Sequence, residues 1–406
     1  MRALGALVGA LTAVSMAIAP SAAAADEQSK QWYLGPMQAE QMWKVSTGEG
    51  VKVAVIDSGV NASTPSLKGQ VLTGEVPKAV AYHATVDYEG HGTSMAELIA
   101  GTGASGGVQG LAPGAKIVPY RIKLDGLKDA KEERKTPESA DAIRAAADTD
   151  VKIINMSFGS EFFDPDEEKA IKYAASKGKL LIAAAGNSGE SKSRMDYPAS
   201  YRYVVGVSSI DSSGTVSKFS SHGNYVDLAA PGEDMPAWCD ANFRSYCDGR
   251  EGTSASAAIA SASAALIWSA HPTWTVNQVT RSLIDTAGRT WAKSDPSKYL
   301  GYGPVRPRKV LADPNYDAGA AYSDPLTREN KRDGEELVTE ASPSPSASPS
   351  SQAPNSSSGG ATSAAGSSAE SSNDSSKSLW IALGAAAAVI VVGGAGVAVM
   401  RARRVT

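Results

Sequence analysis

Three short segments of the chain supply an acid, a base and a hydroxyl group. They are Asp57-Ser58-Gly59, His91-Gly92-Thr93 and Gly252-Thr253-Ser254. Small residues beside each functional side chain let the backbone turn tightly. Acyl transfer through a covalent serine intermediate requires an acid, a base and a hydroxyl nucleophile. The sequence therefore predicts that Ser254 is the nucleophile, that His91 is its general base and that Asp57 orients His91.

Taken singly, each of these residues has a structural alternative: a polar strand end for Asp57, a buried imidazole for His91 and a helix cap for Ser254. Together, in the order Asp, His, Ser, the motifs resemble the subtilases, the subtilisin-like serine proteases. The resemblance covers about residues 31–311 and is strongest to the mycosins, membrane-anchored subtilases associated with type VII secretion in actinobacteria. It implies a serine endopeptidase that processes exported proteins.

The same resemblance assigns further residues. Asn187 is the expected side-chain donor of the oxyanion hole, together with the Ser254 backbone N–H, and its structural alternative is a turn residue. The segments Ser157-Phe158-Gly159 and Ala184-Ala185-Gly186 resemble the walls of the pocket for the P1 side chain, which precedes the cleaved bond. Because neither segment contains an acid, we expect no strong preference for lysine or arginine at P1.

Two stretches depart from the usual subtilase pattern. The catalytic His is normally followed by a second His, whereas here the chain reads Thr93-Ser94-Met95. The nucleophile is normally followed by Met and, four residues on, by Pro, whereas here the chain reads Ala255-Ser256-Ala257-Ala258. No member of the predicted triad is lost, so these departures concern the pocket and the start of the nucleophile's helix.

The elements that must position these groups follow from hydrophobic patterning. Strands are expected at 51–56, 116–120, 151–156, 180–185, 203–208 and 225–229, and helices at 139–147, 167–177, 255–270 and 275–287. This alternation predicts an α/β fold with a mostly parallel central sheet and helices on both faces, which is the three-layer fold of subtilisin-like proteins. Asp57, Ser157 and Asn187 follow strands, where ligands bind in such sheets.

Both ends of the chain carry targeting signals. Residues 1–25 contain an apolar stretch followed by small residues, which predicts a signal peptide cleaved near Ala25, with a retained anchor helix as the alternative. Residues 379–400 are uncharged, are about long enough to cross a bilayer and are followed by arginines. We therefore expect a single-pass cell-membrane protein with its catalytic domain on the extracytoplasmic face and a cytoplasmic tail at 401–406.

Between these ends the sequence divides into four parts. Residues 26–50 form an N-terminal extension that is too short for a foldable pro-domain and is expected to pack on the catalytic domain. The catalytic domain is expected at 51–315 and a domain-end extension at 316–340. Residues 341–378 are rich in Ser, Pro and Ala, and we expect a disordered linker because they cannot bury enough apolar surface.

The two cysteines, Cys239 and Cys247, favour a disulfide in the oxidising compartment outside the membrane, with free thiols as the alternative. Their spacing suits no metal or redox motif, so no metal site or cofactor is expected. Many subtilases bind calcium, but the sequence has no compact acidic loop typical of a calcium site. Calcium binding is therefore neither predicted nor excluded. The net charge of −4, without a basic stripe, argues against a nucleic-acid partner.

Two functional hypotheses follow. In the first, the protein cleaves protein or peptide substrates exported by a type VII secretion system, as the resemblance implies. In the second, it is mainly a structural component that stabilises the membrane complex of that system, with proteolysis secondary. A general surface protease is a third, weaker reading.

Overall fold

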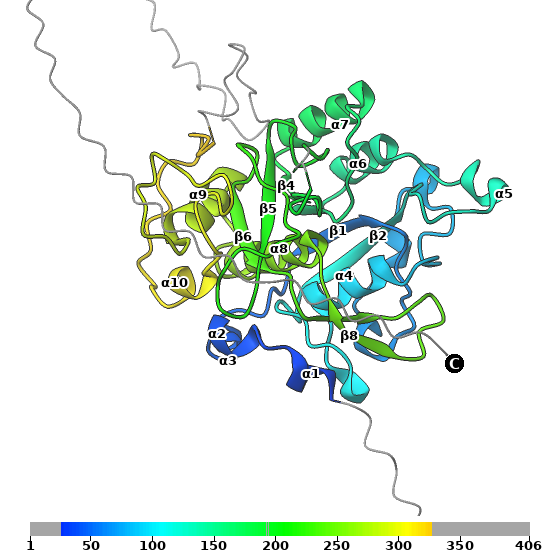
Figure 1. Cartoon of the computed structure of the whole chain (residues 1–406), viewed down its shortest axis with the longest axis horizontal. Helices are drawn as coiled ribbons and strands as arrows, with labels where there is room; N and C mark the ends of the chain where they lie inside the picture. The colour runs from blue at the N-terminus through cyan, green and yellow to red at the C-terminus, as the bar shows by residue number, and fades with distance from the viewer. Residues whose placement is uncertain (1–25, 192, 194, 327–406) are drawn as a thin grey trace, which may run out of the picture. The chain divides into compact units, whose positions relative to one another are not determined.

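The structure is a computed structural model of the chain, and it describes residues 26–326 except 192 and 194 (Figure 1). The predicted signal peptide, linker, transmembrane helix and cytoplasmic tail lie outside the described residues, as does the last part of the domain-end extension. The chain divides into two compact units, Met1–Ser346 and Ala347–Thr406, and all described residues belong to the first.

A six-stranded sheet with the order β2-β1-β3-β4-β5-β6 forms the centre of this unit (Figure 1). All neighbouring strands run parallel. Their side chains are almost completely buried, as the continuous apolar runs in the sequence require for a sheet covered on both faces. The strands are β1 (Lys52–Asp57), β2 (Lys116–Arg121), β3 (Ile153–Met156), β4 (Leu180–Ala184), β5 (Val204–Ile210) and β6 (Leu228–Pro231).

Helices cover both faces of the sheet and enclose two hydrophobic cores. Alternate residues of β1 enter opposite cores: Val53 and Val55 lie in one, and Ala54 and Ile56 in the other. The first core is covered by α2 (Leu34–Met37), α3 (Ala39–Trp43), α4 (His91–Ala100), α8 (Thr253–Ala270), α9 (Val276–Thr286) and α10 (Pro307–Leu311). The second is covered by α6 (Ser139–Ala147) and α7 (Pro165–Ser176). The predicted α/β fold class is confirmed.

Helix α8 runs through the larger core, where nearly all its side chains are buried. It contacts strands β3 to β6 and helix α4. Of the helices in the described residues, α8 is the one long and apolar enough to cross a membrane, but protein surrounds it on most sides. Its alanines and serines let neighbouring backbones approach closely.

Residues 26–50, the predicted N-terminal extension, pack against the rest of the described unit. After a short first helix, α1 (Glu27–Lys30), Tyr33, Met37 and Met42 enter the larger core. The indole N–H of Trp32 donates to the carbonyl oxygen of Glu233 at 2.9 Å. The described part of the domain-end extension lies against α9, where the guanidinium of Arg281 donates to backbone carbonyls between residues 318 and 323.

A small antiparallel hairpin stands apart from the main sheet. Its strands are β7 (Met235–Trp238) and β8 (Tyr246–Arg250), and a disulfide between Cys239 and Cys247 joins them. The hairpin was not predicted, because its residues show no regular alternation of apolar and polar side chains. One further short helix, α5 (Ala130–Glu133), lies in the charged stretch after β2.

Most predicted elements are found within a few residues of their expected bounds. The capping box that opens α9 is present, with Thr275 and Gln278 bonding reciprocally. The strand expected at 225–229 is displaced and lies at 228–231, because Asp227 is tied instead to the backbone of Gly206 and Tyr302. Helix α4 was missed: it starts after Gly90, whose φ of 82° is left-handed and which has no side chain to act as an N-cap.

Candidate active site

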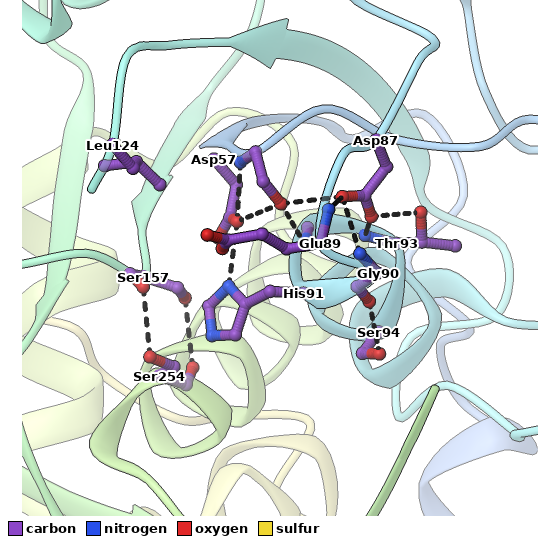
Figure 2. A network of polar contacts seen from close by, with 12 residues as sticks. Asp57, Asp87, Glu89, Gly90, His91, Thr93, Ser94, Leu124, Ser157 and Ser254 are labelled. Carbon is purple, nitrogen blue, oxygen red and sulfur yellow. Dashed lines mark hydrogen bonds and ion pairs between the residues drawn. The ribbon is translucent and has the colours of Figure 1, made fainter. Parts of the chain in front are cut away.

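The predicted acid and base meet where β1 ends and α4 begins. Asp57 is the last residue of β1 and His91 the first residue of α4. The Nδ1 atom of His91 lies 2.8 Å from Oδ1 of Asp57 (Figure 2). A carboxylate accepts hydrogen bonds, so this contact places a proton on Nδ1, and Nε2 is the nitrogen that can accept when the imidazole is neutral. Figure 2 shows this second nitrogen turned toward Ser254.

A buried second acid, Asp87, holds the start of α4 against the end of β1. Its Oδ1 accepts from the backbone N–H groups of Glu89 and Gly90 at 3.0 and 2.8 Å and from the Ser58 hydroxyl at 2.8 Å. Its Oδ2 accepts from the backbone N–H and the hydroxyl of Thr93 at 2.9 and 2.6 Å (Figure 2). Asp87 was not predicted as a site residue, although an Asp shortly before Gly90 is typical of a turn.

The acids around His91 determine its protonation. Burial alone lowers the pKa of His91, but the charge of Asp57 and the hydrogen bond to it outweigh burial. Asp87 and Glu89 add to this attraction, and together they raise the pKa of His91 to about 9. At neutral pH the resting imidazole is therefore mainly protonated, and it becomes a base at alkaline pH.

The predicted nucleophile lies at the start of α8. In this structure the Ser254 hydroxyl donates to the carbonyl oxygen of Ser157 at 3.0 Å. In return, the Ser157 hydroxyl lies 3.0 Å from the carbonyl oxygen of Ser254 (Figure 2). It also lies 3.0 Å from the side-chain oxygen of Asn155, and its one proton is shared between these two acceptors. These contacts fix the first turn of α8 against the segment after β3. Near this end the free N–H groups of the helix favour negative charge.

The predicted oxyanion donor, Asn187, follows β4 closely. Its side-chain carbonyl accepts from the backbone N–H and the hydroxyl of Thr253 at 2.9 and 3.0 Å. A backbone N–H can only donate, so this end of the amide must be the oxygen. The NH2 group therefore lies on the other side. Asn187, His91 and Ser254 line one pocket of about 340 Å³.

The two predicted P1 walls flank the start of α8. The backbone N–H of Gly186 donates to the Thr253 hydroxyl at 3.0 Å, and Ser157 contacts Ser254 as described. Ala184 and Ala185 of the second predicted wall are buried. In the opposite wall Phe158, before Gly159, packs against the second core.

The hairpin of β7 and β8 forms another side of the pocket. Trp238 and Cys239 line it, and the backbone N–H of Trp238 donates to the Ser94 hydroxyl at 2.9 Å. Beneath the hairpin, Glu97 of α4 accepts from the Tyr246 hydroxyl and the Thr64 hydroxyl, each at 2.8 Å. Burial raises the pKa of Glu97 to about 7, although these hydrogen bonds oppose the rise. The sequence analysis did not single out Glu97, because an acid inside a helix has no distinctive pattern.

Metal ligands do not gather in the described part of the chain. Within residues 26–326, leaving out 192 and 194, no group of three or more His, Cys, Asp or Glu side chains is placed to hold a metal ion.

Sequence comparisons identify relatives of this chain. The model of the subtilase family matches residues 48–303. Thermitase from Thermoactinomyces vulgaris is 36% identical over 206 residues, which make up 50% of this chain and 71% of thermitase. The major intracellular serine protease of Bacillus subtilis (strain 168) is 34% identical over 206 residues, or 49% of this chain and 63% of that protease. The match thus spans less than two thirds of the latter relative's length.

Solved structures add mycosins as neighbours. MycP1 from Mycobacterium smegmatis superposes with a TM-score of 0.58 and 25% identity, covering 71% of this chain and 86% of that one. The MycP3 protease from the type VII (ESX-3) secretion system gives a TM-score of 0.56 and 26% identity, covering 71% and 88%. Since the family model covers more than half of the sequence, the chain belongs to the subtilase family.

Proposed function

We propose that this protein is a serine endopeptidase in which Ser254, His91 and Asp57 form the catalytic triad. The observation that carries the proposal is the 2.8 Å contact between His91 and the buried Asp57, at a pocket that Ser254 and Asn187 also line. Membership of the subtilase family supports the same reaction.

The chemistry needs one rearrangement of the resting site. The Ser254 hydroxyl must turn from the Ser157 carbonyl toward Nε2 of His91, as catalytic hydrogen bonds often tighten only when substrate binds. Ser254 Oγ then attacks the carbonyl carbon of the substrate and passes its proton to His91. Asp57 stabilises the imidazolium that forms.

The tetrahedral intermediate places negative charge on the former carbonyl oxygen. The Asn187 NH2 group and the Ser254 backbone N–H are the donors for this oxygen. When the C–N bond breaks, His91 returns the proton to the leaving amine. Water then attacks the acyl-enzyme by the same route, which releases the acid and restores Ser254.

A substrate would bind as an extended strand beside Ser157 and Gly159. In that mode main-chain hydrogen bonds provide affinity and the pockets for alternate side chains provide selectivity. Backbone groups of the neighbouring Ser160 already pair with Tyr197, so the substrate would extend the edge on the other side.

For its physiological role, we propose that the protein is anchored to the cell membrane and processes proteins exported by a type VII secretion system. The likeness to MycP1 and MycP3 supports this role, as do the predicted signal peptide and the predicted transmembrane segment at 379–400. A tether of this kind would raise the effective concentration of the enzyme for substrates that leave a nearby channel.

A fluorophosphonate probe tests the proposed chemistry, because it forms a covalent bond with an activated serine. The full-length chain should be labelled, Ser254→Ala should not be labelled, and Ser213→Ala, at an exposed turn, should be labelled like wild type. A folded wild-type protein that resists the probe would contradict the proposal.

The structural-component hypothesis needs a cellular test. Secretion through the type VII system would be compared in cells that lack the gene, with wild type or Ser254→Ala restored. We expect Ser254→Ala to leave the exported substrate unprocessed. Normal processing in that strain would overturn the proposed role.

A further inference from the structure

We propose that Asp196 forms the base of the P1 pocket and selects substrates with lysine or arginine at P1. This inference rests on the proposed protease function and adds its specificity. Asp196 comes from the loop before β5, and it belongs to neither of the two wall segments identified from the sequence.

Two glycines bring Asp196 to this position. A Cβ atom added to Gly186 would overlap with Oδ2 of Asp196, and a Cβ added to Gly159 would lie 3.5 Å from the Cβ of Asp196. The side chain of Asp196 thus lies against both walls of the pocket. It occupies the space that a side chain at position 186 would otherwise fill.

Main-chain contacts hold Asp196 in place. Its neighbour Tyr197 exchanges two backbone hydrogen bonds with Ser160, at 2.9 and 2.8 Å, just after the Gly159 wall. The carbonyl oxygen of Asp196 accepts from the backbone N–H of Ser200 at 3.0 Å. The backbone of Asp196 is therefore fixed relative to the segment that contains Gly159.

The pocket walls connect Asp196 to the nucleophile. Gly186 bonds to Thr253, and Ser157 bonds to Ser254, so both walls contact the first residues of α8. A substrate whose carbonyl carbon lies at Ser254 would direct its P1 side chain between the walls. The far end of a long P1 side chain would then meet Asp196.

The charge of Asp196 has no cationic partner among the described residues. The Ser221 hydroxyl donates to Oδ2 of Asp196 at a long distance of 3.5 Å. Burial, and then the charge of Glu161, raise the pKa of Asp196, so a second negative charge lies close to the same place. A half-buried carboxylate favours the binding of a cation, and the P1 ammonium or guanidinium group would supply one.

This inference replaces the expectation drawn from the walls alone. The two wall segments, Ser157 to Gly159 and Ala184 to Gly186, contain no acid. For that reason no strong preference for lysine or arginine at P1 was expected. The base of the pocket comes from a third segment, which the sequence did not connect with the other two.

The test compares peptide substrates of the full-length chain that differ only at P1. Lysine is compared with norleucine and arginine with citrulline. Norleucine and citrulline are uncharged and are similar in shape to lysine and arginine. We expect kcat/KM to be at least about tenfold higher for the charged member of each pair. Asp196→Asn should reduce this ratio to within about threefold, whereas Asp196→Glu should retain a preference for the cation.

A matched control comes from the same loop. Glu190→Gln makes the same change of charge at an exposed residue and should leave the P1 ratio unchanged. A wild-type ratio near one would overturn the inference, even if Asp196→Asn fails to fold. So would an Asp196→Asn variant that loses activity equally on all peptides. A protein that reacts with neither the peptides nor the fluorophosphonate probe would instead contradict the proposed protease function.

Discussion

The two sides of the candidate active site are built differently. On the side of the base, buried carboxylates of Asp57 and Asp87 collect hydrogen bonds from groups in two short stretches of chain. On the side of the nucleophile, Thr253 and Ser254 bond to backbone groups and neutral side chains of distant segments, after β3 and β4.

This difference separates two tasks. Acids beside His91 set its charge, so changes there should alter the pH dependence of activity. Neutral contacts around Ser254 set where the reacting oxygen lies, so changes there should alter turnover at every pH. The predictions below test this division, starting with the largest expected effect.

On the nucleophile side, Asn187→Ala should lower kcat by roughly 100- to 1000-fold, the range measured for the loss of one oxyanion donor in a subtilisin. KM and the pH profile should change little, because the donor acts on charge that appears during the reaction. Asn187→Asp is the control: it keeps an acceptor for Thr253 but loses the NH2 donor, and it should be similarly impaired. Full activity of Asn187→Asp would exclude this role.

On the base side, kcat/KM should rise with pH up to a plateau above pH 9. His91 accepts a proton only when neutral, and its pKa of about 9 leaves about 1% neutral at pH 7. Activity at pH 7 should therefore be about 100-fold below the plateau, measured on one peptide at constant ionic strength. A plateau that begins near pH 7 would show that the neighbouring acids do not retain the proton on His91.

Asp87→Asn should shift this profile while leaving the triad intact. The charge of Asp87 helps to raise the pKa of His91, so its loss should move the midpoint to lower pH, by less than about one unit. The Asn side chain has only one oxygen, so the buried N–H groups of Gly90 and Thr93 can no longer both find an acceptor. The free energy of unfolding should therefore fall by about 1–3 kcal/mol. Asp141→Asn, at an exposed position of α6, should change neither quantity. An unshifted midpoint in Asp87→Asn would weaken the comparison.

The smallest effect on activity is expected from Glu97→Gln, beneath the hairpin. The pKa of Glu97 in the folded protein is about 7, above its ordinary value of 4.5. Between these values the unfolded chain ionises while the folded protein stays protonated, so this group lowers stability as pH rises from 4.5 to 7. The loss is on the order of 3 kcal/mol.

Chemical denaturation at pH 4.5, 6 and 8 measures this contribution. The difference in unfolding free energy between wild type and Glu97→Gln should move in favour of the variant as pH rises. A difference that is constant across these pH values would show that Glu97 keeps an ordinary pKa.

The sequence predicted the elements whose signals are local. Strands with continuous apolar runs and the capping box of Thr275 were found close to their expected places. Features that depend on distant partners were missed. The first N–H groups of helix α4 bond to Ser58 and Asp87, which lie outside the helix, because its N-cap is a glycine. The hairpin of β7 and β8 depends on Ser94, Glu97 and a disulfide.

The candidate site divides in the same way. Asp57, His91 and Ser254 were identifiable because each lies in a short motif of distinctive composition. Asp87 and Asp196 were not identifiable, because the role of a single acid in a loop depends on the residues that the fold places beside it. For Asp196 those neighbours are Gly159 and Gly186, and they come from two other segments.

The packing of helix α8 limits which parts of the sequence can change during evolution. Its alanines and serines are enclosed by five strands and three helices, so larger side chains have no room and smaller ones leave gaps. The position of Ser254 is thus inherited with the packing of the whole interior. The loops beyond the strands are free of this constraint, and if Asp196 acts as proposed, one exchange in its loop would change selectivity without disturbing the interior.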